Sequence, residues 1–170
     1  VAKKNLPIVL STGLSELHEI DKAIKTIEKA GNKKIIILHC VAIYPAPDKT
    51  INLKNIETLK KLYSYPIGFS DHSIGYSIPL AATAMGICMI EKHFTLDKNM
   101  FGWDHKVSCD FDELKIICSE TKRISQSLGS NEIKVSEDKN RINEFRRSLV
   151  ANRLIKKGST IKLQDITFKR

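Results

Sequence analysis

The sequence predicts an α/β fold built on a parallel sheet, and three observations support this. Short β-prone runs alternate with segments of helical periodicity along the first 129 residues, which is the pattern of consecutive β/α units. The runs are almost uninterrupted apolar stretches, typical of strands that are buried on both faces. Polar side chains gather where the runs end, and the carboxyl ends of parallel strands are where α/β proteins bind ligands.

Four β-prone runs are expected to form the strands of this sheet. They are rich in isoleucine and span residues 8–11, 35–39, 67–70 and 87–93. The polar residues at their ends are Ser11 and Thr12, His39 and Cys40, Ser70 to His72, and Glu91 to His93. Four successive strands therefore bring polar groups to one edge of the sheet, where we expect the functional site.

Four helical segments follow the strands. They are expected between Ser15 and Gly31, over residues 53–62, over residues 77–85, and between Asp110 and Gly129. Ser15 is the expected N-cap of the first helix. Asp110 and Glu113 have the spacing of a capping box at the start of the fourth helix.

The character of the sequence changes after Gly129. Residues 130–145 are polar and charged and are predicted to be a linker. Residues 146–170 contain short β-prone runs and a Lys-Lys-Gly turn, and they begin a new segment too short for an independent core. The expected organisation is therefore a domain at 1–129, a linker at 130–145 and the start of a second domain at 146–170.

Composition excludes several classes of protein. The 170 residues include 28 Lys+Arg and 19 Asp+Glu, for a net charge of +9, and 42% are hydrophobic, which argues against a disordered chain. No apolar run approaches the roughly 20 residues of a membrane span, and no leader opens the chain, so no membrane partner is expected. No nucleic-acid-binding motif accompanies the basic residues, so no nucleic-acid partner is expected either. The four cysteines lack metal or redox spacing, which predicts a cytoplasmic protein.

Two histidines stand out at the ends of neighbouring strands. Across a strand spacing of about 4.8 Å, His72 and His93 could share one divalent ion. Imidazole suits Mn, Fe, Co or Zn better than Mg. Two ligands leave positions open for water or substrate oxygens, as a catalytic metal requires. The alternative is that either histidine is a hydrogen-bonded interior residue.

Several strings in a fixed order resemble the sialic acid synthase family, also called N-acetylneuraminate synthases. The strings are LSTG at 10–13, LHC followed by YPAP at 38–47, GFSDHSIG at 68–75, IEKHFTLDK at 90–98, RRSLVA at 146–151 and IKKG at 155–158. The resemblance implies a (β/α)8 TIM-type barrel followed by a small, β-rich antifreeze-like domain. Residues 1–129 would then be the second half of the barrel, with four β/α units, and residues 146–170 the beginning of the antifreeze-like domain. The family's first half-barrel, with further phosphoenolpyruvate-binding lysines and an acid/base glutamate, has no counterpart in this sequence.

The resemblance also implies roles for individual residues. His72 and His93 match the metal ligands and would be catalytic through the metal. Ser11 and Ser70 match positions near phosphoenolpyruvate, and Tyr44 matches another active-site position. The alternatives are that the serines cap strand-to-helix turns and that the tyrosine only packs in its loop.

Two further matches concern the sugar. Asp104 matches a carboxylate that holds hydroxyls of the acceptor, although it could simply be solvated. Arg170 matches an arginine that reaches from the partner subunit toward the N-acyl group of the sugar, although a terminal residue can also be disordered. Asp71 is expected to orient a ligand histidine, as metal-bound imidazoles usually require. Trp103, beside Asp104, is expected either to stack on the acceptor or to pack on the barrel rim.

The resemblance implies a synthase that condenses phosphoenolpyruvate with an N-acylated hexosamine, such as N-acetylmannosamine, and releases phosphate. The implied cofactor is a divalent metal, Mn in the first place with Mg or Co as alternatives, and the implied assembly is a domain-swapped homodimer of the full-length enzyme. The acceptor could instead be that of a legionaminic or pseudaminic acid synthase. The 170-residue chain alone is expected to be an inactive fragment. A metal-dependent barrel hydrolase is the alternative from another reaction class, but the sequence has no H-x-H pair to supply its further ligands.

Overall fold

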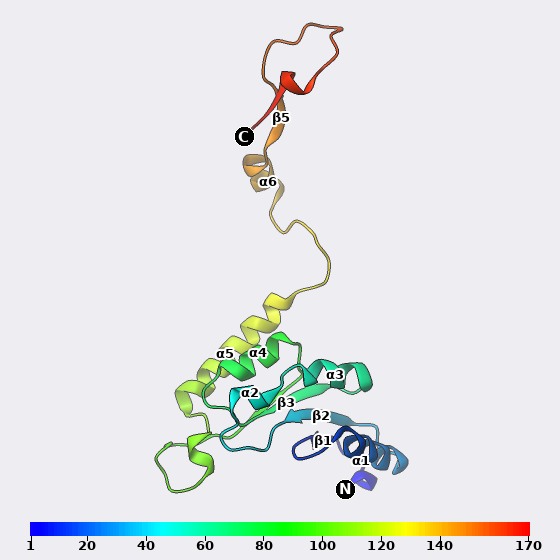
Figure 1. The fold of residues 1–170 in the computed structure, drawn as a ribbon, viewed down its shortest axis with the longest axis vertical. Helices are drawn as coiled ribbons and strands as arrows, with labels where there is room; N and C mark the ends of the chain where they lie inside the picture. Colours follow the sequence, from blue (N-terminus) through cyan, green and yellow to red (C-terminus); the bar gives the residue numbers. More distant parts are fainter. The chain divides into compact units, whose positions relative to one another are not determined.

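A computed structural model describes residues 1–170, which separate into two compact units, Val1–Gly129 and Ser130–Arg170 (Figure 1). The boundary falls at Gly129, which directly follows the last helix of the first unit. No helix in the structure has both the length and the apolar character needed to span a membrane. The four cysteines are unpaired.

The first unit is built on a four-stranded parallel sheet whose strands pair in sequence order. The strands are β1 (Ile8–Ser11), β2 (Ile35–Cys40), β3 (Ile67–Asp71) and β4 (Ile90–Lys92). The register places Cys40 beside Ser70 and Asp71 beside Lys92. This order, with a helix in each connection, is that of half of a (β/α)8 barrel. The predictions of the α/β class and of the parallel sheet are confirmed.

Helices connect the strands. They are α1 (Leu17–Lys29), α2 (Asp48–Ile51), α3 (Asn55–Leu62), α4 (Ser77–Ala84) and α5 (Phe111–Leu128), and Figure 1 shows α5 beside α4. The predicted capping box of α5 is present, with the Glu113 amide donating to Asp110 Oδ1 over 3.0 Å. The predicted N-cap of α1 is wrong by one residue. Glu16 is the N-cap and its amide donates to the Glu19 carboxylate, whereas the Ser15 hydroxyl donates to the Gly13 carbonyl.

The core lies between the sheet and the helices on one of its faces. It is made of apolar side chains from both, including Ile20, Ile24, Ile27, Ile35, Ile37, Ile56, Leu59, Ile67 and Phe69. Strand β3 is buried on both faces as predicted and β2 is mostly so, but the outer strands β1 and β4 are not, because each has a neighbouring strand on one side only. Val9 in β1 is 45% exposed and Glu91 in β4 is exposed.

On the other face of the sheet, the side chains of Leu38 and Met89 fill the space above Gly68. A Cβ added there would lie 2.5 Å from Leu38 Cδ2 and 2.8 Å from Met89 Cγ. This layer of the sheet therefore has room for a glycine only, and it lies beneath the strand ends that carry the polar residues.

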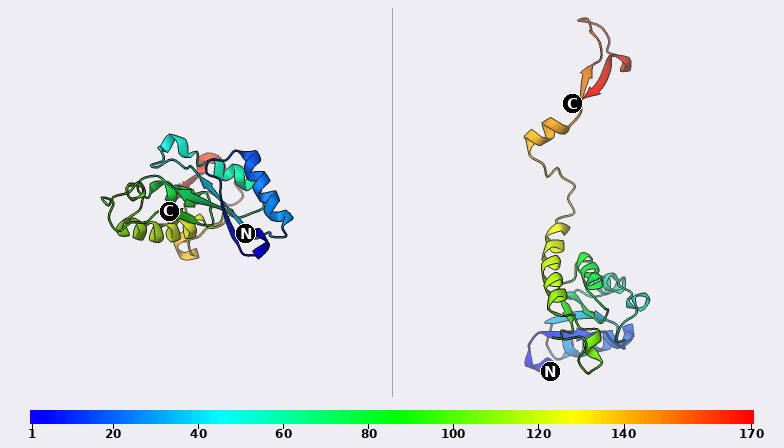
Figure 2. Two further views of the ribbon diagram at one scale, coloured as in Figure 1. Left: turned by 90° about the horizontal axis from the view of Figure 1, so that it is seen from below. Right: turned by 90° about the vertical axis from the view of Figure 1, so that its left-hand side faces the viewer.

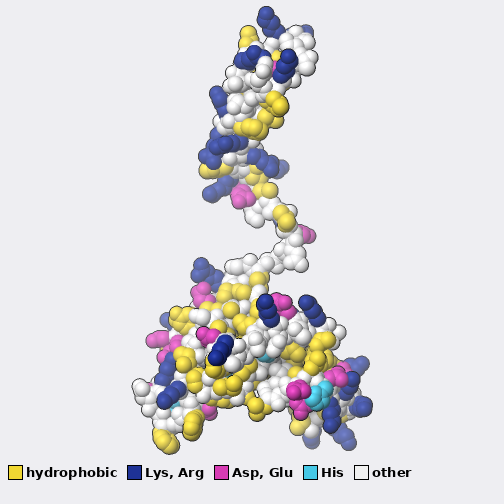
Figure 3. All heavy atoms as spheres, in the orientation of Figure 1, with side chains coloured by type: hydrophobic (Ala, Val, Ile, Leu, Met, Phe, Trp, Pro, Cys, Tyr) yellow, Lys and Arg dark blue, Asp and Glu magenta, His cyan; other side chains and the backbone are white.

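The second unit contains the helix α6 (Lys139–Phe145) and the antiparallel strands β5 (Ser148–Ala151) and β6 (Ile166–Lys169). Figure 2 shows the two strands side by side. The predicted linker is thus partly helical, and Asp138 caps α6 by accepting from the Arg141 amide over 3.0 Å. Among the charged residues of this unit, lysine and arginine outnumber aspartate and glutamate (Figure 3). Its identity as the start of an antifreeze-like domain stays a prediction.

Candidate active site

The ends of three successive strands bring together two histidines and a tyrosine. His72 follows β3 and His93 follows β4, and their ring centroids are 5.3 Å apart with the planes inclined by 57°. Tyr44, in the loop after β2, packs on both rings, with centroid distances of 4.1 Å to His72 and 5.6 Å to His93. Three of the predicted site residues therefore form one cluster at the carboxyl edge of the sheet.

The backbone determines which nitrogen of His72 is free. The ring is buried, and its Nδ1 lies 2.9 Å from the carbonyl oxygen of Val41. Because a carbonyl oxygen only accepts hydrogen bonds, Nδ1 is the nitrogen that carries the proton in the neutral ring, and Nε2 is then the one with a free lone pair. A backbone carbonyl that accepts from one imidazole nitrogen is a common way of orienting the other toward a metal ion.

The spacing of the two rings is compatible with a shared ion. With a metal–nitrogen distance of about 2.1 Å, the centroid of a bound imidazole lies about 3.3 Å from the ion. Two rings on one ion then have centroids about 4.7 to 6.6 Å apart, for angles at the ion from about 90° to 180°, and the observed 5.3 Å falls in that range. No group of three or more His, Cys, Asp or Glu side chains that could hold an ion is present. His72 and His93 therefore fit a divalent ion as its two protein ligands.

A pocket of about 240 Å³ opens beside the histidines, lined by Ser70, His72, Glu91, Lys92 and His93. The Ser70 hydroxyl donates to Glu91 Oε1 over 2.7 Å. Sequence reasoning did not single out Glu91. The two-residue alternation of a strand places Glu91 on the same face as His93, and that signal could have found it.

Asp104 and Ser11 lie at the margin of this cluster. Asp104 Oδ2 is 3.9 Å from His93 Nδ1, too far for a hydrogen bond, and its side chain is 62% exposed. Its carboxylate is therefore open to a ligand that occupies the pocket. Ser11 ends β1, two strands away from Ser70, and its Oγ accepts from the Gly13 amide over 3.3 Å. The structure places Ser11 at the same sheet edge but not in contact with the histidines.

Asp71 does not orient a histidine directly. Its Oδ1 accepts from the Ser73 amide over 2.9 Å and its Oδ2 accepts from Lys92 Nζ over 2.6 Å. Neighbouring residues of a strand point to opposite faces, so Asp71 and His72 cannot face the same site. The orienting contact expected of Asp71 is made instead by the Val41 carbonyl.

His39 also lies away from the site. Its Nε2 is 2.6 Å from the carbonyl of Ile51 and its ring stacks on Phe69. Burial lowers the pKa of His39, although the backbone hydrogen bond opposes the shift. This histidine is neutral and structural.

Tyr44 links the cluster to a second, apolar hollow. Burial raises the pKa of Tyr44, and its neighbours Cys40, Asp104 and Glu91 raise it further, so the phenol stays protonated and can donate a hydrogen bond. Tyr44 also lines a hollow of about 740 Å³ together with Pro45, Asn99, Met100, Phe101, Gly102, Trp103 and Lys106. Trp103 is 91% exposed, so it does not pack on the rim of the sheet.

Arg170 belongs to the second unit. Its Nε donates to the Phe145 carbonyl over 3.3 Å, and its guanidinium carbon lies 5.1 Å from the centroid of the Phe145 ring. Its role toward the sugar stays a prediction.

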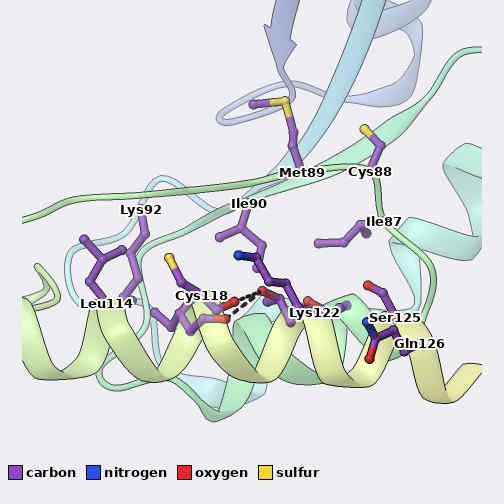
Figure 4. A pocket seen from close by; sticks show the side chains of 13 residues that line it. Ile87, Cys88, Met89, Ile90, Lys92, Leu114, Cys118, Lys122, Ser125 and Gln126 are labelled. Carbon is purple, nitrogen blue, oxygen red and sulfur yellow. Dashed lines mark hydrogen bonds between the residues drawn. The ribbon is translucent and has the colours of Figure 1, made fainter.

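Another pocket, of about 590 Å³, lies between β4 and α5 (Figure 4). Its walls are mainly apolar, and Ile90 points from β4 toward α5 whereas the Met89 side chain points away from the helix. Burial raises the pKa of Cys88, which leaves a protonated thiol rather than a reactive thiolate. We assign no chemistry to this pocket.

A parallel half-barrel with polar side chains at the carboxyl edge of its strands defines the chain as part of a (β/α)8-type fold. Residues 1–133 match the model of the NeuB family, and the chain belongs to that family. It is 47% identical over 174 residues to the N,N'-diacetyllegionaminic acid synthase of Campylobacter jejuni, covering 100% of this chain and 52% of the relative. It is 36% identical over 168 residues to a pseudaminic acid synthase of the same species, covering 98% and 48%.

Among solved structures, the chain resembles the N-acetylneuraminic acid (sialic acid) synthetase from Leptospira borgpetersenii, determined in complex with citrate. The TM-score is 0.77 at 39% identity, covering 85% of this chain and 50% of that one. The chain spans about half the length of the relatives it matches.

Proposed function

We propose that the protein is a nonulosonic, sialic-type acid synthase, which condenses phosphoenolpyruvate with an N-acylated hexosamine and releases phosphate. Membership of the NeuB family and the names of the relatives support the reaction class. The observation that carries the proposal is the cluster of His72, His93 and Tyr44 at the carboxyl edge of the half-barrel. The full-length protein is proposed to be a homodimer in which Arg170 serves the site of the partner subunit.

His72 and His93 would hold a divalent metal ion, in the first place Mn²⁺, with Mg²⁺ or Co²⁺ as alternatives. Such an ion supplies Lewis-acid polarisation of a carbonyl oxygen. The protein contributes a buried His72 whose Nε2 is free to bind, and a Tyr44 ring that packs on both imidazoles and restricts their rotation.

In the proposed reaction the methylene carbon of phosphoenolpyruvate bonds to the aldehyde carbon of the open-chain sugar. Water adds to the carbon that carries the phosphate, the C–O bond to phosphate breaks, and a 2-keto acid and inorganic phosphate are formed. The Ser70 hydroxyl lines the pocket and is held by Glu91, so it is placed to contact the donor. The exposed Asp104 carboxylate is placed to accept a hydrogen bond from an acceptor hydroxyl. The net charge of +9 favours association with an anionic donor.

A diacetamido sugar is the second candidate acceptor, beside N-acetylmannosamine. Phosphoenolpyruvate carries no nitrogen, so both acetamido groups of an N,N'-diacetyl product must come from the acceptor. The chain is 47% identical to the diacetyllegionaminic acid synthase and 36% identical to the pseudaminic acid synthase. The hollow lined by Tyr44, Met100, Phe101 and Trp103 offers an apolar surface for acyl or deoxy groups. The higher identity favours a legionaminic acid synthase over a pseudaminic acid synthase.

A phosphate-release assay tests the proposal. Full-length protein is incubated with phosphoenolpyruvate and Mn²⁺, with N-acetylmannosamine or with diacetamido hexoses of the two stereochemical series, and products are identified by mass spectrometry. We expect phosphate release that requires an acceptor and a product that gains three carbons. Hydrolysis of a test ester or amide without consumption of phosphoenolpyruvate would instead support a metal-dependent hydrolase.

A further inference from the structure

A buried ion pair lies behind the two histidines and has no part in the chemistry described above. Lys92 Nζ is 2.6 Å from Asp71 Oδ2, and the two side chains are 4% and 0% exposed. Lys92 Nζ also donates to the Ser73 carbonyl over 2.7 Å, and the Ser73 amide donates to Asp71 Oδ1 over 2.9 Å. Three residues thus form a closed network at the ends of β3 and β4.

The position of the pair along the two strands connects it to the site. Asp71 and Lys92 are register partners, and each directly precedes a histidine. Because side chains alternate along a strand, the ion pair lies on one face of the sheet and the histidines on the other. The pair therefore joins the two strand ends at the level of His72 and His93, and Lys92 also contributes to the wall of their pocket.

Few other contacts of the outer strand β4 could fix the distance between His72 and His93. β4 has only three residues and pairs with one strand, β3. Beyond it, the Cys109 amide donates to the His93 carbonyl over 2.8 Å, which ties His93 to the start of α5 rather than to β3. Two side-chain links cross from one histidine-bearing strand to the other: the hydrogen bond from the Ser70 hydroxyl to Glu91 on the pocket side, and the contact between Asp71 and Lys92, which is the only one of the two that joins opposite charges.

Stability alone is a poor explanation for such a pair. Removing two charges from water costs about as much as their attraction returns, and apolar pairs of similar volume are often equally stable. We propose that Asp71 and Lys92 are positioning residues that hold His72 and His93 at the spacing needed to bind one divalent ion. This inference rests on the proposed function in that it takes the two histidines as the metal ligands.

The main test is the double variant Asp71→Asn/Lys92→Met in the full-length protein. Both charges are removed at nearly constant volume, so no unpaired charge is left buried. Titration of metal-free protein with Mn²⁺, followed by electron paramagnetic resonance of the free ion, gives the dissociation constant. We expect the constant to rise about 10- to 100-fold, the range seen when contacts that orient metal ligands are lost. Unchanged affinity in the folded double variant would overturn the proposal.

The matched control is Lys98→Met. Lys98 also follows β4 and forms an ion pair, with Nζ 2.5 Å from Glu113, but it neighbours neither histidine. Its Mn²⁺ affinity is expected to stay within about twofold of that of the wild type. If the double variant does not fold, the Lys92→Arg variant is measured instead. It keeps the positive charge but changes the length and shape of the side chain that contacts Asp71. A several-fold loss of affinity in Lys92→Arg supports the proposal, and wild-type affinity contradicts it.

A second measurement separates this inference from the proposed function. In metal-free protein with labelled histidines, the rings of His72 and His93 are close enough for a nuclear Overhauser effect, at a centroid distance of 5.3 Å. The double variant is expected to lose that effect. Wild-type protein that shows the effect but binds no Mn²⁺ would refute the metal site and leave the spacing role standing. A double variant that keeps the effect at full strength would refute the spacing role.

Discussion

Removal of the Tyr44 ring is expected to weaken metal binding at the two histidines. The ring lies 4.1 Å from His72 and 5.6 Å from His93, centroid to centroid. Aromatic pairs at such distances contribute about 0.5–1.5 kcal/mol each, so two of them could contribute about 1–3 kcal/mol. Tyr44 is 42% exposed, which favours the lower part of that range, about 1–2 kcal/mol. Because part of this packing is already present without metal, the full conversion is an upper limit, and the Tyr44→Ala variant should bind Mn²⁺ more weakly by up to about 5- to 30-fold.

Isothermal titration of metal-free protein with Mn²⁺ measures this change, and Tyr44→Phe is the matched control. Phenylalanine keeps both ring contacts and loses only the hydroxyl, so its metal affinity should stay within about threefold of that of the wild type. Wild-type affinity in Tyr44→Ala would refute the packing argument. Equal losses in the two variants would show that the hydroxyl, and not the ring, supports the site.

Four further predictions concern stability, acceptor binding, assembly and completeness. Gly68→Ala adds a Cβ that would lie 2.5 Å from Leu38 Cδ2, and it should destabilise the protein by about 1–3 kcal/mol in calorimetry; an unchanged melting temperature would contradict this. Arg170→Ala should raise the KM for the aminosugar about 10- to 150-fold, for a charge-assisted hydrogen bond of about 1.5–3 kcal/mol, and should affect the KM for phosphoenolpyruvate much less. Mixing Arg170→Ala with His72→Ala subunits should restore up to half of the wild-type activity per mixed dimer if the arginine acts in trans, and none if it acts in cis. The purified 170-residue chain should release no phosphate from phosphoenolpyruvate, because catalysis of this kind relies on preorganised groups from several strands; acceptor-dependent turnover would contradict that expectation.

Much of the first unit could be predicted from the sequence, because strand and helix periodicities are strong over its length. The capping box at Asp110 was predicted from the local sequence alone, and the structure confirms it. Helix α6 was missed since its seven residues are mostly polar, and only the cap at Asp138 marks it. The exposure of Val9 depends on what covers the inner face of the sheet. The local sequence pattern around a strand does not indicate this.

Some residues of the candidate site could be predicted from the sequence, and others could not. His72 and His93 were found because each follows a β-prone run, and Tyr44 because of its motif. The partner of His72 Nδ1 is the carbonyl of Val41, a backbone group that side-chain patterns do not reveal. Asp71 was assigned to a histidine by proximity in sequence, whereas strand alternation sends it to the opposite face, toward Lys92.

The most direct test of the central claim is acceptor-dependent phosphate release by the full-length protein after metal removal and again after addition of Mn²⁺, with His93→Ala measured in parallel. The account predicts that release requires phosphoenolpyruvate, an N-acylated hexosamine and Mn²⁺ together. It also predicts that His93→Ala stays inactive at every Mn²⁺ concentration while keeping its fold by circular dichroism. Wild-type turnover by His93→Ala, or phosphate release that does not depend on the sugar, would contradict the account.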